Sequence, residues 1–334
     1  MSFGPRARCT GMMNFDDPQL RRALHVHCYR MVGSFSDADD LVQEALLRAW
    51  RARDSFDAGT GELGLRRWLY RIATNACLDF LRDARRTAPS LERSFAEVPW
   101  LEPYPDRLLD ELPAASAGPE AETARKETIA LGYLALIQIL PPQQRAVLVL
   151  RDVQGWSAAE VADALELTVA AANSSLQRAR ETVAKHAAHM GVMGADAGAM
   201  AVAEPAASER AILAAFIDAH ERGDRDASRK LLAPDFRVTM PPQPMIFVGL
   251  AQWEQLADTA WGRPGGAPGM GDWRLVAAWA NRMPAALSYL RRPGDSQFRA
   301  FKIDVLRVER GIIREITTFD PRLVGTLGQP EVLP

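Results

Sequence analysis

Two different spacings of hydrophobic residues divide the chain into helical and strand-forming parts. Through residues 15–86 and 123–189, apolar side chains recur every three to four positions, which predicts amphipathic helices. Beyond residue 208, helical runs at 209–221 and 250–261 precede alternating apolar and polar positions. This alternation predicts strands at 273–281, 285–292, 298–309 and 312–319. We therefore expect two all-α blocks followed by an α+β domain, residues 208–325, with an antiparallel sheet.

Two segments without this periodicity separate the parts. Residues 87–122 contain six prolines and eight acidic residues but only two basic ones, which predicts an extended, acidic linker. Residues 190–207 are rich in small side chains and predict a second, flexible linker. Residues 1–11 are interpreted as an unstructured leader, with Met12 or Met13 as alternative starts.

The overall charge limits how the protein can bind nucleic acid. Its 334 residues carry 40 Lys and Arg against 42 Asp and Glu, a formal net charge of -2. This balance excludes a general basic coat, so any DNA contact must come from a local basic surface. The three cysteines have no paired spacing, which argues against a disulfide framework and for a cytoplasmic location. No apolar run is long enough to span a bilayer, so no membrane partner is expected.

The helical run that starts near Ser36 has two distinct faces. Ser36 is the expected N-cap, and acidic residues in the first turn suit the helix dipole. Leu41, Ala45 and Ala49 recur every four residues and are expected to face a core. The other face mixes acidic and apolar side chains, and on spacing alone it is either solvated or a surface for a partner.

A second helical run, residues 65–86, combines an apolar stripe with a polar one. The apolar stripe, expected to face the core, consists of Leu65, Leu69, Ile72, Ala76 and Phe80. The polar stripe consists of Arg71, Asn75, Asp79, Arg82 and Arg86. Arginines one turn apart can follow a phosphate backbone, and an asparagine can read a base edge. Trp68 and Tyr70 flank this stripe and can stack on unpaired bases. The alternative is that Trp68 belongs to the core and the arginines only solubilise the surface.

Two motifs in this block resemble region 2 of the bacterial extracytoplasmic-function sigma factors. They are Asp37–Glu44 (DADDLVQE) and Arg67–Asp79 (RWLYRIATNACLD), and the resemblance covers roughly residues 20–86. It implies that the acidic helix binds the clamp of core RNA polymerase through Asp39, Asp40, Gln43 and Glu44. It also implies that the loop 53–64 and the helix after it bind the −10 element, where one base is flipped from the stack. The residues expected to contact −10 DNA are Trp68, Arg71, Asn75, Asp79, Arg82 and Arg86.

The second helical block has the pattern of a helix-turn-helix. Ser157 and Glu160 form an expected capping box, and Thr168 caps a final helix that runs to about His186. Residues 140–185 resemble sigma region 4, which reads the −35 element in the major groove. The resemblance implies contacts with −35 DNA and with the flap of the polymerase.

The final helix of this block is expected to have a DNA face and a packing face. The expected DNA face consists of Asn173, Ser174, Gln177, Arg178 and Arg180. The expected packing face consists of Leu176, Ala179 and Val183. The family usually carries a lysine and an arginine where this sequence has Asn173 and Ser175, so fewer charges face the DNA.

Within the acidic linker, Pro99–Asp106 (PWLEPYPD) resembles the linker of a sigma-factor subgroup that also has a C-terminal extension. Nucleic-acid channels of polymerases are basic, so an extended acidic strand can occupy one as a nucleic-acid mimic. The alternative is a plain spacer between the two helical blocks.

The order of elements after residue 208 resembles the cone-shaped SnoaL-like, or nuclear-transport-factor-like, fold. Such cones enclose an apolar pocket, and the candidate lining residues are Trp253, Trp279 and Tyr289, with Trp261 and Phe301. The alternative is that these aromatic side chains form the core. A small molecule in this pocket is a candidate partner.

Some proteins with this fold are enzymes, and the titratable candidates for acid–base chemistry here are His220, Asp304 and Asp320. None of them lies in a recognisable motif, so no catalytic residue, cofactor or enzymatic activity is expected. His25–Cys28 (HVHC) is interpreted as helix packing and not as a metal site, because residues i and i+2 of a helix point apart.

The sequence thus predicts a sigma factor that directs RNA polymerase to promoters and aids DNA melting, with its activity modulated by the C-terminal domain. One alternative is a SnoaL-type cyclase or isomerase fused to a DNA-binding module. Another is a ligand-responsive repressor. Region 2 argues against both alternatives, because neither needs a polymerase-binding helix or a melting loop.

Overall fold

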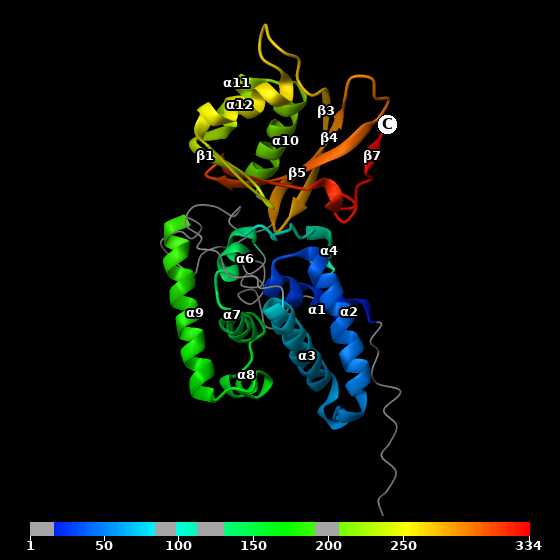
Figure 1. Cartoon of the computed structure of the whole chain (residues 1–334), viewed down its shortest axis with the longest axis vertical. Helices are drawn as coiled ribbons and strands as arrows, with labels where there is room; N and C mark the ends of the chain where they lie inside the picture. Colours follow the sequence, from blue (N-terminus) through cyan, green and yellow to red (C-terminus); the bar gives the residue numbers. More distant parts are fainter. Residues whose placement is uncertain (1–16, 84–97, 112–129, 191–206) are drawn as a thin grey trace, which may run out of the picture. The chain divides into compact units, whose positions relative to one another are not determined.

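The computed structural model describes residues 17–83, 98–111, 130–190 and 207–334 (Figure 1). The chain divides into two compact units. The first, here called the helical unit, contains residues 17–83 and 140–181 together with Glu111. The second, here called the sheet unit, contains residues 98–110, 130–139, 182–190 and 207–334. The leader, Arg86 and most of both expected linkers lie outside the described residues.

Three helices form the first part of the helical unit: α1 (Pro18–Val32), α2 (Phe35–Ala52) and α3 (Gly61–Asp83). Two 3-10 turns, Arg53–Ser55 and Ala58–Thr60, connect α2 to α3. The expected cap of α2 is wrong by two residues. Gly33 ends α1 in the left-handed conformation, so the chain is already extended at Ser34, whose side chain accepts from the Asp37 amide.

The core face of α3 is also rotated from the expected one. Leu69 and Ala76 are buried as expected, but Leu65, Ile72 and Phe80 are only half-buried. Small side chains on the adjoining face, such as Ala73 and Cys77, are buried in their place. Small residues let α1 and α2 pack closely on α3, so the helix turns that face inward.

The second part of the helical unit follows the expected pattern. Helix α7 (Pro142–Leu148) continues through a π-helical turn, Val149–Val153, and is followed by α8 (Ala158–Ala164) and α9 (Val169–Met190). The capping box of Ser157 and Glu160 is present in both directions. Thr168 caps α9 by accepting from the Ala171 amide.

Buried Arg145 connects the two parts of the helical unit. Its guanidinium, which has no exposed surface, donates to the carbonyl oxygens of Met31 at the end of α1 and of Leu140 before α7. A charged group without access to water must satisfy its donors within the protein, so this side chain fixes α7 against α1.

Two helices of the sheet unit come before the C-terminal α+β domain in the chain. They are α4 (Asp106–Asp110) and α6 (Leu131–Gln138). Its remaining helices are α10 (Ala207–Glu221), α11 (Arg225–Leu231) and α12 (Gly249–Trp261). Its strands are β1 (Leu232–Met240), β2 (Gln243–Val248), β3 (Asp272–Ala280), β4 (Met283–Arg291), β5 (Phe298–Glu309), β6 (Ile312–Phe319) and β7 (Val332–Leu333). The short helix α11 and strands β2 and β7 were not expected from the sequence pattern.

The strand order is β2-β1-β6-β5-β4-β3, and β7 pairs with β5. Strands β3 to β6 are antiparallel, as expected, but β1 runs parallel to β6. The sheet is therefore mixed. The chain crosses through α12 from β2 at one edge to β3 at the other, and the antiparallel strands β3 to β6 then lead back to β1. Helices α10 and α12 cover one face of the sheet, and the core between them contains Phe216, Phe236, Trp253, Trp273 and Ile316 (Figure 1). The expected class, helical blocks followed by an α+β cone, is confirmed.

Candidate functional site

The exposed face of α2 carries the acidic residues expected to bind the polymerase. Asp39, Asp40 and Gln43 are exposed, while Glu44 is half-buried and accepts from Arg48 at 2.7 Å. One turn further on, Leu47 and Trp50 add exposed apolar surface, with 43% and 55% of their area accessible. An acidic patch beside exposed apolar side chains is typical of a protein-binding surface.

The polar stripe on α3 is partly engaged in ion pairs. Asp79 accepts from Arg48 at 2.8 Å and from Arg82 at 3.1 Å. Arg71 pairs with Asp163 of α8 at 3.1 Å, and Arg67 pairs with Glu160. These pairs are solvent-exposed and each is worth about 0–1 kcal/mol. They would have to open before Arg67 or Arg71 contacted phosphates, and opening them costs little. Asn75 is half-exposed on the same stripe.

The aromatic residues near this stripe are held by the fold. Trp68 is half-buried, and its ring lies 5.2 Å from that of Phe56 in the loop before α3. The rings of Tyr70 and His27 pack in a T-shaped arrangement, with their centroids 4.9 Å apart. In the loop, Asp57 accepts from the Gly59 amide at 2.9 Å, which shapes the turn that leads into α3. Trp68 is thus neither fully in the core nor fully exposed.

Helix α9 has one buried face and one exposed face. The expected packing residues Leu176, Ala179 and Val183 are buried, and the expected DNA residues Asn173, Ser174, Gln177, Arg178 and Arg180 are exposed.

The basic residues of this DNA face have different intramolecular contacts. Arg180 donates twice to Asp152, at 2.9 and 2.6 Å, which raises the pKa of its guanidinium. Among the described residues, Arg178 makes only a long contact, 3.3 Å, with the Ser175 hydroxyl. Arg178 can therefore reach DNA without breaking an ion pair, whereas Arg180 must leave Asp152.

The two histidines of the HVHC motif are buried in the helical unit. The Thr74 hydroxyl donates to the Tyr70 carbonyl, so it accepts from Nε2 of His27 at 2.8 Å. Burial lowers the pKa of His27 to about 3 and that of His25 to about 4. Neutral, buried rings fit packing between helices. Among the described residues, no group of three or more His, Cys, Asp or Glu side chains could hold a metal ion.

In the sheet unit, residues 98–110 are not a free strand. The backbone of Tyr104 forms two hydrogen bonds with Asn281 in the turn between β3 and β4. Its amide donates to Oδ1 of Asn281, and its carbonyl accepts from the Asn281 amide, both at 2.8 Å. Tyr104 and Asn281 have no exposed surface. Asn281 and Arg282 have positive φ angles of 55° and 61°, which turn their polar groups toward the linker.

Additional contacts extend this attachment, which we call the linker clamp: Glu102–Asp110 bound to the β3–β4 turn and the C-terminal segment. The Arg282 amide donates to Asp106 at 2.8 Å, and its guanidinium pairs with Asp110 at 2.6 Å. Burial raises the pKa of Asp106 to about 6, although the contacts with Arg282 oppose this shift.

Two longer-range contacts complete the linker clamp. Arg107 donates to the carbonyl oxygen of Thr326, at 3.1 and 2.6 Å. Arg322, just after β6, pairs with Glu102 at 2.8 Å. The described part of the expected linker is therefore bound at several points between Glu102 and Asp110. No sequence pattern indicated its partner Asn281, which we had assigned to a strand.

A cavity of about 480 Å³ lies between the sheet and helices α10 and α12. Trp253, Trp261 and Phe301 line it, as expected. The assignments of Trp279 and Tyr289 are wrong. Tyr289 lies on the opposite face of β4 from the core residue Leu290, and its hydroxyl donates to the Pro330 carbonyl at 2.8 Å.

Trp279 shares the core face of β3 with Trp273 but lies six residues further along the strand. That distance is about 20 Å, beyond the end of the cavity. The strand pattern gives the face of each residue correctly but not its position relative to the covering helices.

The three titratable candidates, His220, Asp304 and Asp320, all line the cavity. The sequence analysis missed Lys302, whose Nζ lies 2.8 Å from Asp304 Oδ2. The two residues share a face of β5 at a spacing of two, a pattern that could have revealed the pair. The Thr318 hydroxyl donates to the other oxygen of Asp304 at 2.7 Å. The wholly buried Asp304 carboxylate thus has a partner on each oxygen.

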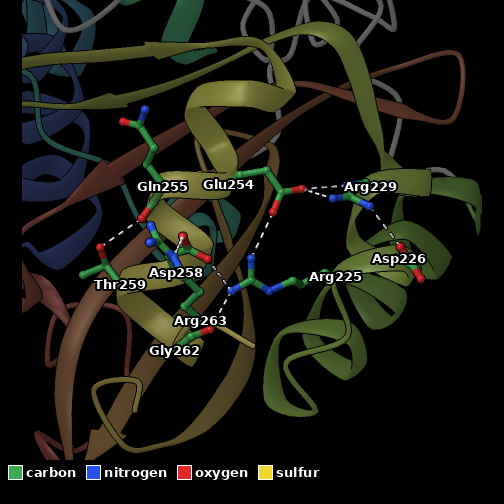
Figure 2. Close-up of polar contacts among 9 residues, drawn as sticks. All are labelled: Arg225, Asp226, Arg229, Glu254, Gln255, Asp258, Thr259, Gly262 and Arg263. Atoms are coloured by element: carbon green, nitrogen blue, oxygen red, sulfur yellow. Dashed lines mark hydrogen bonds and ion pairs between the residues drawn. The ribbon is translucent and has the colours of Figure 1, made fainter. Parts of the chain in front are cut away.

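Figure 2 shows how α11 fixes α12, which forms one wall of the cavity. Arg225 pairs with Glu254 and Asp258 of α12, both at 2.9 Å, and donates to the Gly262 carbonyl at 2.6 Å. Its side chain is only 18% exposed. Arg229 also contacts Glu254. The outer face of α12 is therefore anchored by charges, while its inner face contributes aromatic and aliphatic side chains to the cavity.

Comparisons with known proteins agree with both halves of this picture. Sigma-70 region 2 matches residues 19–87, and sigma-70 region 4 matches residues 131–183. The ECF RNA polymerase sigma factor SigG of Mycobacterium tuberculosis is 39% identical over 329 residues, which cover 94% of this chain and 82% of that protein. The chain belongs to the ECF sigma factors. The family resemblance drawn from the two motifs is confirmed.

Other relatives of this sigma factor show how far the likeness extends. SigW of Bacillus subtilis is 31% identical over 173 residues, covering 47% of this chain and 79% of that protein. The crystal structure of SigJ of Mycobacterium tuberculosis covers 95% of this chain and 99% of that chain, with a TM-score of 0.58 and 23% identity. SigJ therefore shares the fold across the helical and sheet parts of this sigma factor.

As a member of this family, the protein directs RNA polymerase to promoters, and its partners are the polymerase and promoter DNA. These predictions of function and partners are confirmed. Among the described residues, no helix is long and apolar enough to cross a membrane.

Proposed function

We propose that three surfaces of the helical unit carry out promoter recognition. Asp39, Asp40, Gln43 and Glu44 bind the polymerase clamp. Trp68, Arg71, Asn75, Asp79, Arg82 and Arg86 bind the −10 element. Asn173, Ser174, Gln177, Arg178 and Arg180 bind the −35 element. The exposure of the α2 and α9 residues supports these assignments, as does the arginine stripe on α3.

Charge reversal on α2 tests the polymerase surface. In the double variant Asp39→Lys/Asp40→Lys, the sigma factor should no longer co-migrate with core polymerase on a sizing column. Asp295→Lys, which reverses an exposed charge in the loop after β4, is the matched control and should bind normally. Normal binding of the α2 double variant would contradict the assignment.

Removal of Arg178 tests the −35 surface. Arg178→Ala should weaken promoter binding by the polymerase holoenzyme by about 1–3 kcal/mol. The control is Lys185→Ala, an exposed cation on the same helix outside the proposed set. Equal affinities of the wild type and the Arg178 variant would refute this contact.

We also propose that the C-terminal domain regulates the sigma factor by holding the linker, and that it is not an enzyme. The linker clamp carries this proposal, because it removes Glu102–Asp110 from any other partner. The enzyme alternative is less well supported, because Thr318 and Lys302 already occupy the Asp304 carboxylate. A cytoplasmic location belongs to this proposal, since the polymerase acts there.

Run-off transcription with core polymerase tests the regulatory role. Asn281→Ala removes the acceptor of the Tyr104 amide and should cost the linker clamp about 2 kcal/mol, which shifts the bound-to-released ratio by about 30-fold. Release should raise the transcript yield. Arg310→Ala is the matched control, since Arg310 has a similar positive φ of 53° in the β5–β6 turn.

Two outcomes would count against this regulation. An unchanged yield with Asn281→Ala would show that the linker clamp does not limit initiation. An equal rise with Arg310→Ala would show that strain in the sheet, and not the linker contact, is responsible. Truncation after residue 190 shows in addition whether the domain is needed for activity at all.

A further inference from the structure

The first turns of α9 carry no charge, unlike the second half of its DNA face. Residues 167–177 contain no Asp, Glu, Lys or Arg, and the next cation along the helix is Arg178. Two side chains in this stretch are exposed and chemically distinct: Val169, with 46% of its area accessible, and Asn173. The start of the helix therefore presents methyl groups and a carboxamide to the outside, and no ion.

Val169 and Asn173 lie on the same face of α9, because four residues make slightly more than one helical turn. Thr168 fixes this first turn, since its hydroxyl accepts from the Ala171 amide at 3.1 Å. A valine in a helix is confined largely to one side-chain rotamer, so its methyl groups have a fixed direction. The two exposed side chains are thus held in a defined position relative to each other.

Asn173 differs from its polar neighbours on this face in its intramolecular contacts. The Gln177 amide donates to Glu181 at 2.9 Å, and the Ser174 hydroxyl donates to the Ala171 carbonyl at 3.2 Å. Among the described residues, the side chain of Asn173 has no hydrogen-bond partner. Its carbonyl oxygen and its amino group are therefore both available to a ligand that offers a donor beside an acceptor.

The bases of DNA differ in what they present in the major groove. Guanine presents two acceptors, which match Arg or Lys, and cytosine presents an amino donor, which matches Asp or Glu. Neither kind of side chain occurs in residues 167–177. Adenine presents a donor beside an acceptor, which matches an asparagine, and thymine presents a methyl group, which matches an aliphatic side chain. The first turns of α9 thus match A·T pairs and have no matching group for G·C pairs.

We propose that Asn173 forms two hydrogen bonds with an adenine of the −35 element and that Val169 contacts the methyl group of a nearby thymine. The two residues are about 6 Å apart along the helix axis, and stacked bases are about 3.4 Å apart, so the two base pairs are adjacent or one step further apart. The N-terminal residues of the second helix of a helix-turn-helix contact base edges, which places both side chains at the bases. This inference rests on the proposed assignment of α9 to the −35 element.

Selection of duplexes from a random pool by the polymerase holoenzyme defines the −35 element and tests the inference. The element should contain two A·T pairs whose identity depends on these side chains. Asn173→Ala should lose the preference for adenine at one pair, a change of about tenfold in Kd. Val169→Ala should lose the preference for thymine at the other, a change of about fourfold. Both side chains are exposed, so neither variant should disturb folding.

Base analogues in the selected element then assign each contact to its atoms. 7-Deazaadenine lacks the N7 acceptor and should weaken binding of the wild type but not of Asn173→Ala. Uracil lacks the methyl group of thymine and should weaken binding of the wild type but not of Val169→Ala. The matched controls are Gln255→Ala, which removes an exposed carboxamide, and Val248→Ala, which removes a valine that is 47% exposed. Both controls lie in the sheet unit and should respond to the analogues as the wild type does.

The outcomes separate this inference from the assignment on which it rests. A −35 element that depends on Arg178 but consists only of G·C pairs would overturn the inference and leave the assignment of α9 intact. Equal weakening of the wild type and of the matching variant by an analogue would show that the side chain does not read that base. Absence of any selected −35 sequence would refute both the assignment and the inference.

Discussion

The helical unit and the linker clamp bury titratable side chains with opposite consequences for pH. In the helical unit, burial lowers the pKa of His25 to about 4 and that of His27 to about 3. In the sheet unit, burial raises the pKa of Asp106 in the linker clamp to about 6. The same cause, loss of water around the charged form, therefore favours neutral histidines in the helical unit and a protonated aspartate in the linker clamp.

The difference shows that acid should act on the helical unit and on the linker clamp in opposite directions. The unfolded helical unit takes up protons on its histidines before the folded unit does, so its stability falls as pH drops below about 6.5. The linker clamp takes up a proton on Asp106 before the released linker does, so its attachment strengthens as pH drops from about 7 toward 4. Acid thus loosens the DNA-binding part while it tightens the linker clamp.

The largest expected effect is a mutation that destabilises the helical unit without destabilising the sheet unit. Arg145→Met leaves the carbonyl oxygens of Met31 and Leu140 without their donor and should destabilise the helical unit by about 3–5 kcal/mol. Hydrogen exchange resolved along the chain should show lower protection in α1 and α7 and unchanged protection in β4 and β5. Equal losses in both units would mean that they unfold as one body. The exposed Arg178→Ala is the control for loss of a charge.

Acid titration of the helical unit should give the next largest effect. Between pH 6.5 and 4.5, each buried histidine should cost about 2 kcal/mol of stability. Urea unfolding at several pH values, monitored by exchange in α1, measures this slope. The double variant His25→Gln/His27→Gln cannot take up these protons, so its slope should be flatter. An identical slope would assign the acid sensitivity to other groups.

The linker clamp should respond with the opposite sign and a smaller size. From pH 7.5 to 5, the free energy that protects the Asn281 amide, which donates to Tyr104, should rise by about 1–2 kcal/mol. The measurement is the exchange protection factor, corrected for the intrinsic pH dependence. Asp106→Asn should abolish the pH dependence. A linker clamp that weakens in acid would invert the comparison and refute the role of Asp106.

The smallest effect concerns a single helix cap. Ser157→Ala removes the acceptor of the Glu160 amide and should cost the helical unit about 1 kcal/mol. A lower urea midpoint of the helical unit, with the sheet unit unchanged, is the expected result. No change in either midpoint would show that α8 does not contribute to the cooperative unfolding of its unit.

The two units also differ in how much of them the sequence predicts. Long amphipathic runs and capping residues place α9 and α10 to within a few residues, and alternation gives β5 and β6 with their observed bounds. These signals are local, since each depends on residues within a turn or two. The predicted core face of α3 was wrong because alanine and cysteine contribute little to a hydrophobic pattern. These small side chains nevertheless allow the closest helix packing.

What the sequence does not predict depends on partners distant in the chain. The parallel pairing of β1 with β6 joins residues about 80 positions apart, and no local pattern specifies it. The same is true of Tyr104 and Asn281. The sequence therefore predicted an extended, acidic linker, whereas its residues 102–110 are bound to the sheet unit. The cavity was correctly anticipated at Trp253 and Asp304, but Lys302, the partner of Asp304, was found only from the structure.

The turn that follows β6 joins two features of the sheet unit within three residues. Asp320 and Pro321 belong to the cavity wall, and Arg322 binds Glu102 of the linker. The Arg322 amide donates to Asp320 at 2.9 Å, so this turn is rigid. Residues two apart are separated by at most about 7 Å. A molecule bound in the cavity that displaced Pro321 would also displace the adjacent Arg322, whose guanidinium pairs with Glu102. The peptide connection between these two residues would then couple occupancy of the cavity to the linker contact.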